Sequence, residues 1–337
     1  MEEFWEIYEK MWKTMKKYLD IYGFDIFFVG CLMASLAFLG VAFFVSKWLL
    51  FGAILFAIPN LIYLLYKPLS YIPRISCHRL SLGTNKTMRV VFLTDLHFHE
   101  FMPKKYYKRA FEKVNKLDAD VILFGGDFVH DRNTDFEQLK ELKKLKAKYK
   151  IGVLGNHDYD IRKDDFKADN ITKVNYEYGD LVEKELEKNG VTILRNENFE
   201  VRLSEDGQHF SLNIFGLDSL WAKRNDLRKY KPCAHNIILA HNPRLFEGIN
   251  LDNAKNVDLV LCGHNHGGGQ IRLNKWFSAH ILMGILQPIW FRAFGRWVSG
   301  KYVNKHGQKM LLSRGLGLTG VSVRINCPPE ITVIDIV

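Results

Sequence analysis

The sequence predicts an α/β fold, a layered sheet flanked by helices, preceded by an apolar N-terminal region. From Met88 onward, short runs rich in Val, Ile, Leu and Phe alternate with stretches of helical period. Five of the apolar runs end just before short polar motifs, as strands do at the sheet edge where α/β proteins bind ligands. Residues 24–66, by contrast, are nearly all apolar. These observations predict a catalytic domain of about 250 residues behind a helical appendage.

Composition sets broad limits on the class of protein. The chain has 337 residues, of which 47% are hydrophobic, enough for one large domain with a sizeable core. The formal net charge of +10 is compatible with phosphate-bearing partners, nucleic acid or an anionic membrane surface, but by itself it favours an ordinary solvated surface rich in lysine, as in Lys140–Lys150. The five cysteines are scattered without a CxxC spacing, which argues against a disulfide framework and favours a reducing compartment.

The N-terminal elements are predicted to meet a membrane. Residues 1–23 have apolar positions three and four apart, which suits an amphipathic helix, either at a membrane surface or packed on the catalytic domain. Residues 24–66 form a predicted transmembrane region, because Phe24–Val45 reaches the ~20 apolar residues of a span and Leu49–Tyr66 nearly does. Residues 67–87 are predicted to be a linker.

Two topologies remain open for this region: a helical hairpin, or a single span followed by an interfacial segment. A soluble helical pair is the alternative to both. Basic residues flank the whole block, whereas its central break carries only Lys47. The positive-inside rule therefore favours a hairpin with both termini in the cytoplasm.

The catalytic domain is predicted to span residues 88–337. Apolar runs predict strands at Val90–Thr94, Val121–Phe124, Ile151–Leu154, Phe210–Gly216, Ile237–Ala240, Val257–Cys262, Met310–Ser313 and Glu330–Ile336. Amphipathic spacing predicts helices at Lys104–Leu117, Phe136–Tyr149 and Gly179–Asn189.

The polar motifs carry the chemistry. They are Asp95-Leu96-His97, Gly125-Gly126-Asp127, Gly155-Asn156-His157-Asp158, His241 before Asn242-Pro243, and Gly263-His264-Asn265-His266. Ligand-type residues two apart face the same way in extended chain, and a carboxylate can bridge two ions. The mixed nitrogen and oxygen donors suit Mn²⁺, Fe or Zn²⁺. Two ions about 3.5 to 4 Å apart can promote an in-line phosphoryl displacement.

This ordered set of motifs resembles the calcineurin-like metallophosphoesterase family over roughly residues 88–337. The resemblance implies a β-sandwich of two mixed sheets flanked by helices. It also implies one metal ion on Asp95, His97, Asp127 and His266, and a second on Asp127, Asn156, His241 and His264. Mn²⁺ is the favoured ion, with Fe or Zn²⁺ also compatible. His157 would stabilise the transition state or protonate the leaving oxygen, with Asp158 orienting it, while His99 matches no ligand position.

The C-terminal segments Ser313–Gly317 and Arg324–Glu330 resemble a bacterial membrane-tethered branch of that family, which includes UDP-2,3-diacylglucosamine pyrophosphatases. Arg314 and Arg324 are therefore candidates for clamping a phosphate, or else structural ties between loops. The branch implies a location at the bacterial inner membrane, with the catalytic domain facing the cytoplasm.

Two insertions bear on the substrate. Residues 276–297 are apolar and aromatic, and their Trp290, Arg292 and Arg296 are predicted substrate contacts in a flap able to touch membrane or acyl chains. An ordinary core helix pair is the alternative. Residues 159–178 are polar and charged, and form either the other half of a cap or a solvated loop.

The favoured function is a membrane-bound dinuclear-metal phosphohydrolase acting on a phosphorylated amphiphile. The best specific candidate is hydrolysis of UDP-2,3-diacylglucosamine to UMP and 2,3-diacylglucosamine 1-phosphate in lipid A synthesis. A broad phosphodiesterase or nuclease on soluble substrates, a protein phosphatase and a non-catalytic membrane scaffold are the alternatives. No aromatic-basic track for stacking bases stands out, so no nucleic-acid partner is expected, whereas membrane lipid is.

Overall fold

The computed structural model describes most of the catalytic region and parts of the N-terminal region. The described residues are 25–39, 47–83, 87–100, 102–103, 105–161, 174–205, 208–249, 254–272 and 297–337, with side chains left out at 47–52 and 204–209. The chain divides into two compact units, residues 1–72 with 318–325 and residues 73–317 with 326–337. The predicted amphipathic segment 1–23 lies outside the described residues.

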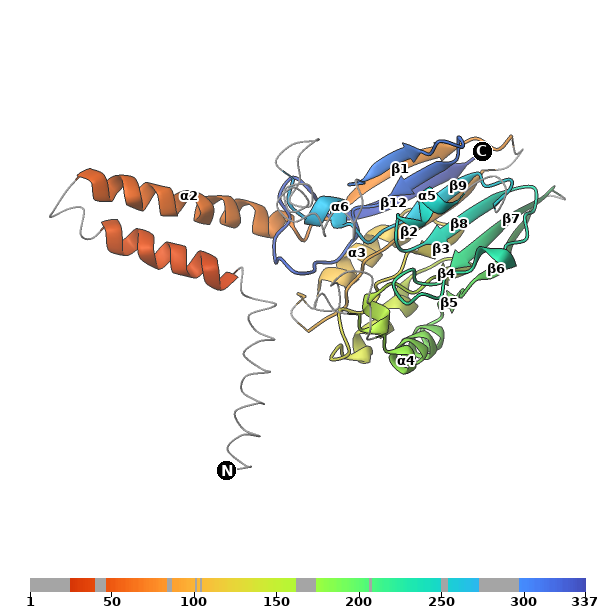
Figure 1. Cartoon of the computed structure of the whole chain (residues 1–337), viewed down its shortest axis with the longest axis horizontal. Helices are drawn as coiled ribbons and strands as arrows, with labels where there is room; N and C mark the ends of the chain where they lie inside the picture. Colours follow the sequence, from red (N-terminus) through yellow and green to blue (C-terminus); the bar gives the residue numbers. More distant parts are fainter. Residues whose placement is uncertain are drawn as a thin grey trace, which may run out of the picture. The chain divides into compact units, whose positions relative to one another are not determined.

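The larger unit contains two six-stranded sheets (Figure 1). The first runs in the order β1 (Arg74–Leu80), β12 (Glu330–Ile336), β2 (Met88–Leu93), β3 (Val121–Phe124), β4 (Tyr149–Gly152) and β5 (Thr192–Ile193). The second runs in the order β10 (Gly300–Val303), β11 (Lys309–Leu312), β9 (Leu259–Cys262), β8 (Asn236–Ala240), β7 (Gln208–Leu217) and β6 (Glu197–Glu205).

Both sheets are mixed and share one hydrophobic core. Strands β2, β3, β4 and β5 pair in parallel, as do β7, β8, β9 and β11, whereas β12 is antiparallel to β2. The core alternates along β2, where Val90 and Phe92 face residues such as Leu239 and Leu261 of the second sheet. The intervening Val91 and Leu93 are also fully buried, so both faces of β2 are buried from Val90 to Leu93. The predicted sandwich of two mixed sheets is confirmed.

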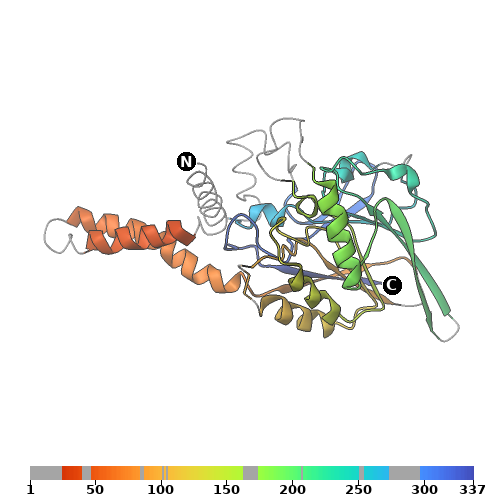
Figure 2. The ribbon, with the colours of Figure 1, turned by 90° about the horizontal axis from the view of Figure 1, so that it is seen from below.

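Helices flank the strands of this unit (Figures 1 and 2). The longest are α3 (Tyr106–Asn115), the 3-10 helix η1 (Phe136–Lys144) and α4 (Tyr176–Lys188). Short turns follow at η2 (His157–Tyr159), η4 (Leu227–Lys229), α5 (Leu245–Gly248) and α6 (His266–Gly269). Asp135 caps η1 and Asn175 caps α4 by accepting backbone N–H bonds, which fixes where each begins. The predicted helix Phe136–Tyr149 is wrong at its end, because Tyr149 already belongs to β4.

The predicted linker at residues 67–87 also differs from the structure. It contains β1, which pairs in parallel with β12 in the register Arg74 to Glu330 through Leu80 to Ile336. The strand lies at the edge of its sheet, and most of its residues are exposed or half-buried. Its polar side chains hide the strand pattern, because an edge strand needs few apolar residues.

The described part of the smaller unit is a pair of helices with a short loop. Residues 25–39 are helical and lie beside α2 (Lys47–Leu69), with Phe28 stacked on Tyr63 at 4.5 Å between ring centroids and Ser35 Oγ donating to the Ala53 carbonyl at 3.0 Å. The loop 318–325 is bound to the helices at two points. Ser322 Oγ donates to the Asp25 carboxylate at 2.7 Å, and the Arg324 N–H donates to Ser70 Oγ at 2.7 Å.

Apolar side chains of this pair remain exposed. Leu36, Ile58 and Leu61 are each at least half exposed. Among the described residues, however, no helix combines the length and the apolarity needed to cross a membrane. The transmembrane region predicted over residues 24–66 is therefore not supported by the structure.

We expect Leu261→Ala to lower the free energy of unfolding by about 2–5 kcal/mol, because Leu261 is fully buried between the two sheets and its truncation leaves a cavity. Urea denaturation of the full chain measures this change. Val303→Ala, at a position 67% exposed on β10, is the control and should change stability by less than about 0.5 kcal/mol. Equal losses for the two variants would contradict a shared core between the sheets.

Candidate metal centre

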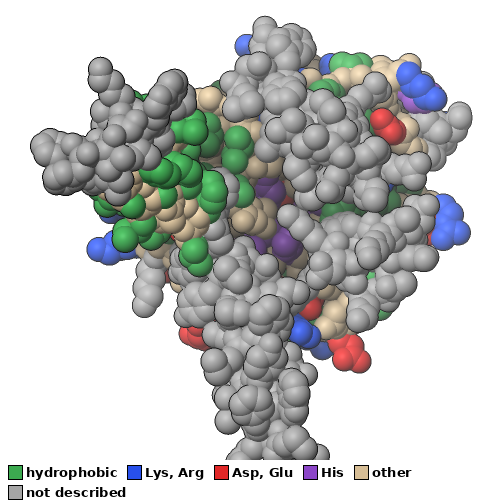
Figure 3. Space-filling model, turned by 60° about the vertical axis from the view of Figure 1, so that its left-hand side comes forward, with side chains coloured by type: hydrophobic (Ala, Val, Ile, Leu, Met, Phe, Trp, Pro, Cys, Tyr) green, Lys and Arg blue, Asp and Glu red, His purple; other side chains and the backbone are tan. Residues whose placement is uncertain are grey.

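The predicted ligands follow the carboxyl ends of parallel strands from both sheets. Asp95 and His97 come after β2, Asp127 after β3 and Asn156 after β4, all in the first sheet. The second sheet contributes His241, after β8, and the pair His264 and His266, after β9. All seven side chains are buried, and histidine side chains are visible in a hollow of the surface (Figure 3). The structure thus brings the whole predicted ligand set to one place.

Asp95, His97 and His266 form the first donor set, called site A here. One donor atom of each lies within 4.8 Å of the other two. The Nε2 atoms of His97 and His266 are 2.9 Å apart, and His266 Nε2 is 3.4 Å from Asp95 Oδ1.

Asp127, His241 and His264 form the second set, called site B, with Asn156 beside them. His241 Nε2 lies 3.2 Å from Asp127 Oδ2, 3.1 Å from His264 Nδ1 and 3.1 Å from Asn156 Oδ1. Asp127 Oδ2 is also 3.6 Å from His97 Nε2 of site A. One carboxylate oxygen therefore faces donors of both sites.

These spacings fit two divalent ions. Donor atoms about 2.1 Å from one ion lie roughly 3 Å from each other, which is the separation within each set. Carboxylate oxygens and imidazole nitrogens together accept Mn²⁺, Fe or Zn²⁺, so the donor set does not choose among them. The His/Asp clusters fit the predicted dinuclear centre.

The neighbouring backbone fixes which atom each ligand presents. His241 Nδ1 donates to the Gly125 carbonyl at 2.7 Å, so its Nε2 presents the lone pair to site B. Asp95 accepts from the His264 N–H at 2.9 Å, and Asp127 Oδ1 accepts from the His157 N–H at 2.9 Å. The loops from different strands thus hold one another's ligands.

Five ligands sit on backbone with positive φ, an arrangement that stores strain at a functional site. They are Asp95 (52°), His97 (46°), Asp127 (53°), His264 (75°) and His266 (45°). Glycine allows the loops to approach: a Cβ at Gly155 would lie 2.1 Å from Asp127 Oδ1, and one at Gly263 would lie 2.5 Å from Asp95 Oδ2.

Asp127 and His241 form a buried ion pair. Burial alone would raise the pKa of Asp127, but His241 and His157 outweigh it and hold that pKa well below its usual range. Burial alone would lower the pKa of His241, but Asp127 outweighs it and raises that pKa to about 9. Since a coordinated imidazole must be neutral, His241 would have to give up this proton to hold a cation in site B.

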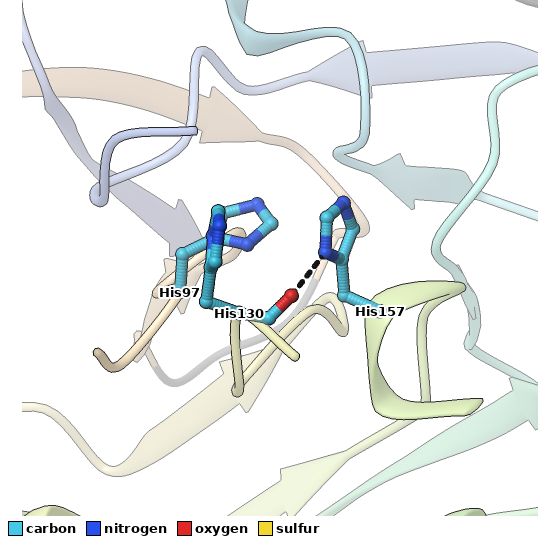
Figure 4. A group of neighbouring side chains, drawn as sticks. All are labelled: His97, His130 and His157. Atoms are coloured by element: carbon cyan, nitrogen blue, oxygen red, sulfur yellow. Dashed lines mark hydrogen bonds between the residues drawn. The ribbon is translucent and has the colours of Figure 1, made fainter. Parts of the chain in front are cut away.

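His157 belongs to a further histidine cluster beside site A (Figure 4). One ring nitrogen each of His97, His130 and His157 lies within 4.8 Å of the other two. His157 Nδ1 donates to the backbone carbonyl of His130 at 2.5 Å. Because a carbonyl can only accept, Nδ1 carries hydrogen and Nε2 is the atom left for chemistry.

The hydrogen bonds of Asp158 do not match its predicted role of orienting His157. Its Oδ1 accepts from the N–H groups of Phe128 and Val129, at 2.9 and 3.1 Å, and its Oδ2 accepts from that of Gly155, at 2.8 Å. Asp158 therefore joins the loops after β3 and β4, whereas the carbonyl of His130 orients His157.

The predicted substrate contacts are placed only in part. Arg314 pairs with the buried Glu330, Nε to Oε2 at 2.9 Å, as a tie between loops would. Arg324 is buried, in the smaller unit. Trp290, Arg292 and Arg296 lie outside the described residues, as do most of the insertions 159–178 and 276–297. The roles of all five in substrate binding stay predictions.

His130 and Trp221 also lie beside the centre, and neither was predicted from the sequence. His130 follows Asp127 by three residues, so the motif could have been extended to include it. Trp221 contacts the ring of His264 at 4.4 Å between centroids. It stands in a turn far from any motif, and no local signal indicates it.

Comparison with known proteins agrees with the motifs. A family model described as Calcineurin-like phosphoesterase matches residues 88–268. The uncharacterized metallophosphoesterase YkoQ of Bacillus subtilis is 28% identical over 74% of this chain and 84% of its own. Phosphodiesterase YaeI of Escherichia coli is 28% identical over 77% and 87%, respectively. UDP-2,3-diacylglucosamine pyrophosphatase LpxG of Chlamydia trachomatis is 29% identical over 72% and 82%.

We expect the protein to bind about two Mn²⁺ ions per chain, and Asp127→Ala to lose both, because that carboxylate faces both donor sets. Asp95→Ala and His264→Ala should each retain about one ion. Elemental analysis after gel filtration measures the stoichiometry, and circular dichroism checks folding. A folded Asp127→Ala variant that keeps one tightly bound ion would show that the carboxylate is not shared.

Asp158→Asn should lower the free energy of unfolding by about 1–3 kcal/mol. Both oxygens of Asp158 accept hydrogen bonds from backbone N–H groups, whereas in the variant the NH₂ group of the amide would face one of these donors and could not accept its bond. Asp135→Asn, at the cap of η1, is the matched control and should be nearly neutral, since Asn caps as well as Asp. Chemical denaturation compares the two. Unchanged stability in Asp158→Asn together with lost turnover would return Asp158 to the role of orienting His157.

Proposed function

Because the chain belongs to the calcineurin-like phosphoesterase family and is thus a metal-dependent phosphoric ester hydrolase, we propose that it hydrolyses a lipid-linked pyrophosphate. The specific candidate is UDP-2,3-diacylglucosamine, cleaved to UMP and 2,3-diacylglucosamine 1-phosphate. The observation that carries the hydrolytic part is the single oxygen, Asp127 Oδ2, that faces donors of both site A and site B.

The residues divide the chemistry among them. Asp95, His97, Asp127 and His266 would hold one ion, and Asp127, Asn156, His241 and His264 the other. Two bound ions would neutralise phosphoryl oxygens and activate water for in-line attack, with Mn²⁺ the proposed native metal. When both ring nitrogens of His157 carry hydrogen, Nε2 would give its proton to the leaving oxygen, while Nδ1–H stays bonded to the His130 carbonyl and orients the ring.

Two observations support a lipid substrate. The named pyrophosphatase among the relatives acts on a diacylated sugar nucleotide, as its name says. The helical pair exposes Leu36, Ile58 and Leu61, side chains that a lipid surface would cover. We propose that this pair meets the cytoplasmic face of a bacterial inner membrane.

A soluble phosphodiester is the second candidate, favoured by the similarity to a named phosphodiesterase. A non-catalytic scaffold is disfavoured, because every ligand position is filled by a metal-binding residue and the side chains converge.

The test is UMP release from UDP-2,3-diacylglucosamine by the full chain in detergent with Mn²⁺. We expect turnover that falls at least about 100-fold in Asn156→Ala and His264→Ala, whereas His306→Gln, on the turn between β10 and β11, stays near wild type. A chromogenic soluble diester is assayed alongside. Turnover of the soluble diester alone would replace the lipid substrate by the second candidate, and full activity in Asn156→Ala would contradict the two-metal mechanism.

A further inference from the structure

A buried carboxylate outside the metal centre joins two segments that each hold a residue of the centre. Asp218 directly follows β7 and is 2% exposed. Its Oδ1 accepts from Tyr159 Oη at 2.6 Å and from the Ser219 N–H at 2.7 Å, and its Oδ2 accepts from Arg195 Nε at 3.2 Å. A carboxylate is buried at this depth only when such partners offset its desolvation.

The first segment is the loop that carries His157. Tyr159 stands two residues later in the same short turn, and its ring is fully buried. A Cβ at Gly179 of α4 would lie 2.5 Å from that ring, so the helix packs directly on it. The guanidinium of Arg195 lies over the ring at 5.6 Å and pairs with Asp180 and Glu183 of α4. The end of the His157 loop is thereby fixed by the helix and by the carboxylate.

The second segment is the turn that carries Trp221. This turn, residues 220–223, starts two residues after Asp218, and Trp221 is 6% exposed, with its ring perpendicular to that of His264 at 4.4 Å. The turn is also fastened to α4, because Tyr176 Oη donates to the Ala222 carbonyl at 3.1 Å. The indole thus packs against His264, a ligand of site B, and the position of the indole depends on Asp218.

We infer that Asp218, through Tyr159 and Trp221, is a positioning device for His157 and His264 together. Tyr159 and Trp221 are positioning residues that act through those two histidines. The inference rests on the proposed function of the centre, in which His157 donates a proton and His264 holds an ion. It follows that the hydroxyl of Tyr159, although remote from the reacting groups, influences the rate of the reaction.

The first test is Tyr159→Phe, which removes one hydroxyl and keeps the ring. We expect kcat to fall about tenfold with KM nearly unchanged, as when a residue that fixes the orientation of a functional side chain is removed. Tyr230→Phe is the matched control, because its buried hydroxyl donates to the Lys255 carbonyl at 2.9 Å. Both variants should lose similar thermal stability, but the control should keep its kcat. Equal kcat values in the two variants would overturn the positioning role of Tyr159.

The second test needs no substrate, so it stands even if the proposed reaction is wrong. Co²⁺ is titrated into the full chain, and its visible absorption reports the geometry of each bound ion. Trp221→Leu should weaken Co²⁺ binding in site B about tenfold and alter the spectrum of that ion, while the ion in site A binds as in wild type. Trp221→Phe should restore part of both. Wild-type affinity and spectrum in Trp221→Leu would overturn the positioning role of Trp221.

Discussion

The metal centre depends on one buried anion, Asp127. Two cations held a few ångströms apart repel strongly in a site that excludes water, and a carboxylate between them is what makes their proximity tolerable. Asp127 faces histidines of both sites, has a backbone φ of 53°, and leaves no room for a side chain at Gly155. The loops after β2, β3, β4, β8 and β9 therefore have to converge on the carboxylate of Asp127.

The two-sheet architecture makes that convergence possible. Parallel strands bring their carboxyl ends to the same edge of a sheet, and the hydrophobic core that the two sheets share holds these edges next to each other. Hydrogen bonds then pass between loops rather than within them: Asp158 joins the loops after β3 and β4, and the His264 N–H reaches Asp95. Strain at the ligand positions is sustained because each loop is held by a neighbour.

Much of this could be predicted from the sequence, because apolar runs followed by ligand-type residues reveal both strand and site. All seven predicted ligands converge, and strands such as Val121–Phe124 have the predicted bounds. The strand β1 could not be predicted, because an edge position tolerates its polar residues. The partner of Asp158 was missed because adjacency to His157 says nothing about where a carboxylate points. The pairing of Tyr159 with Asp218 joins residues 59 apart, which no local pattern encodes.

At the loop 318–325 the chain leaves the catalytic unit, enters the helical unit and returns. This loop belongs to the helical unit, through Ser322 to Asp25 and Arg324 to Ser70, although the residues on either side of it belong to the catalytic unit. Just before it, the Gly317 N–H donates to the Asp95 carbonyl, and just after it, Cys327 Sγ donates to that of His266. Cutting away residues 1–72 would remove Asp25 and Ser70, two hydrogen-bond partners of this loop, whereas Gly317 and Cys327 on either side of it would keep their bonds to Asp95 and His266. A catalytic unit cut out as residues 73–337 would therefore still carry part of the helical unit within it.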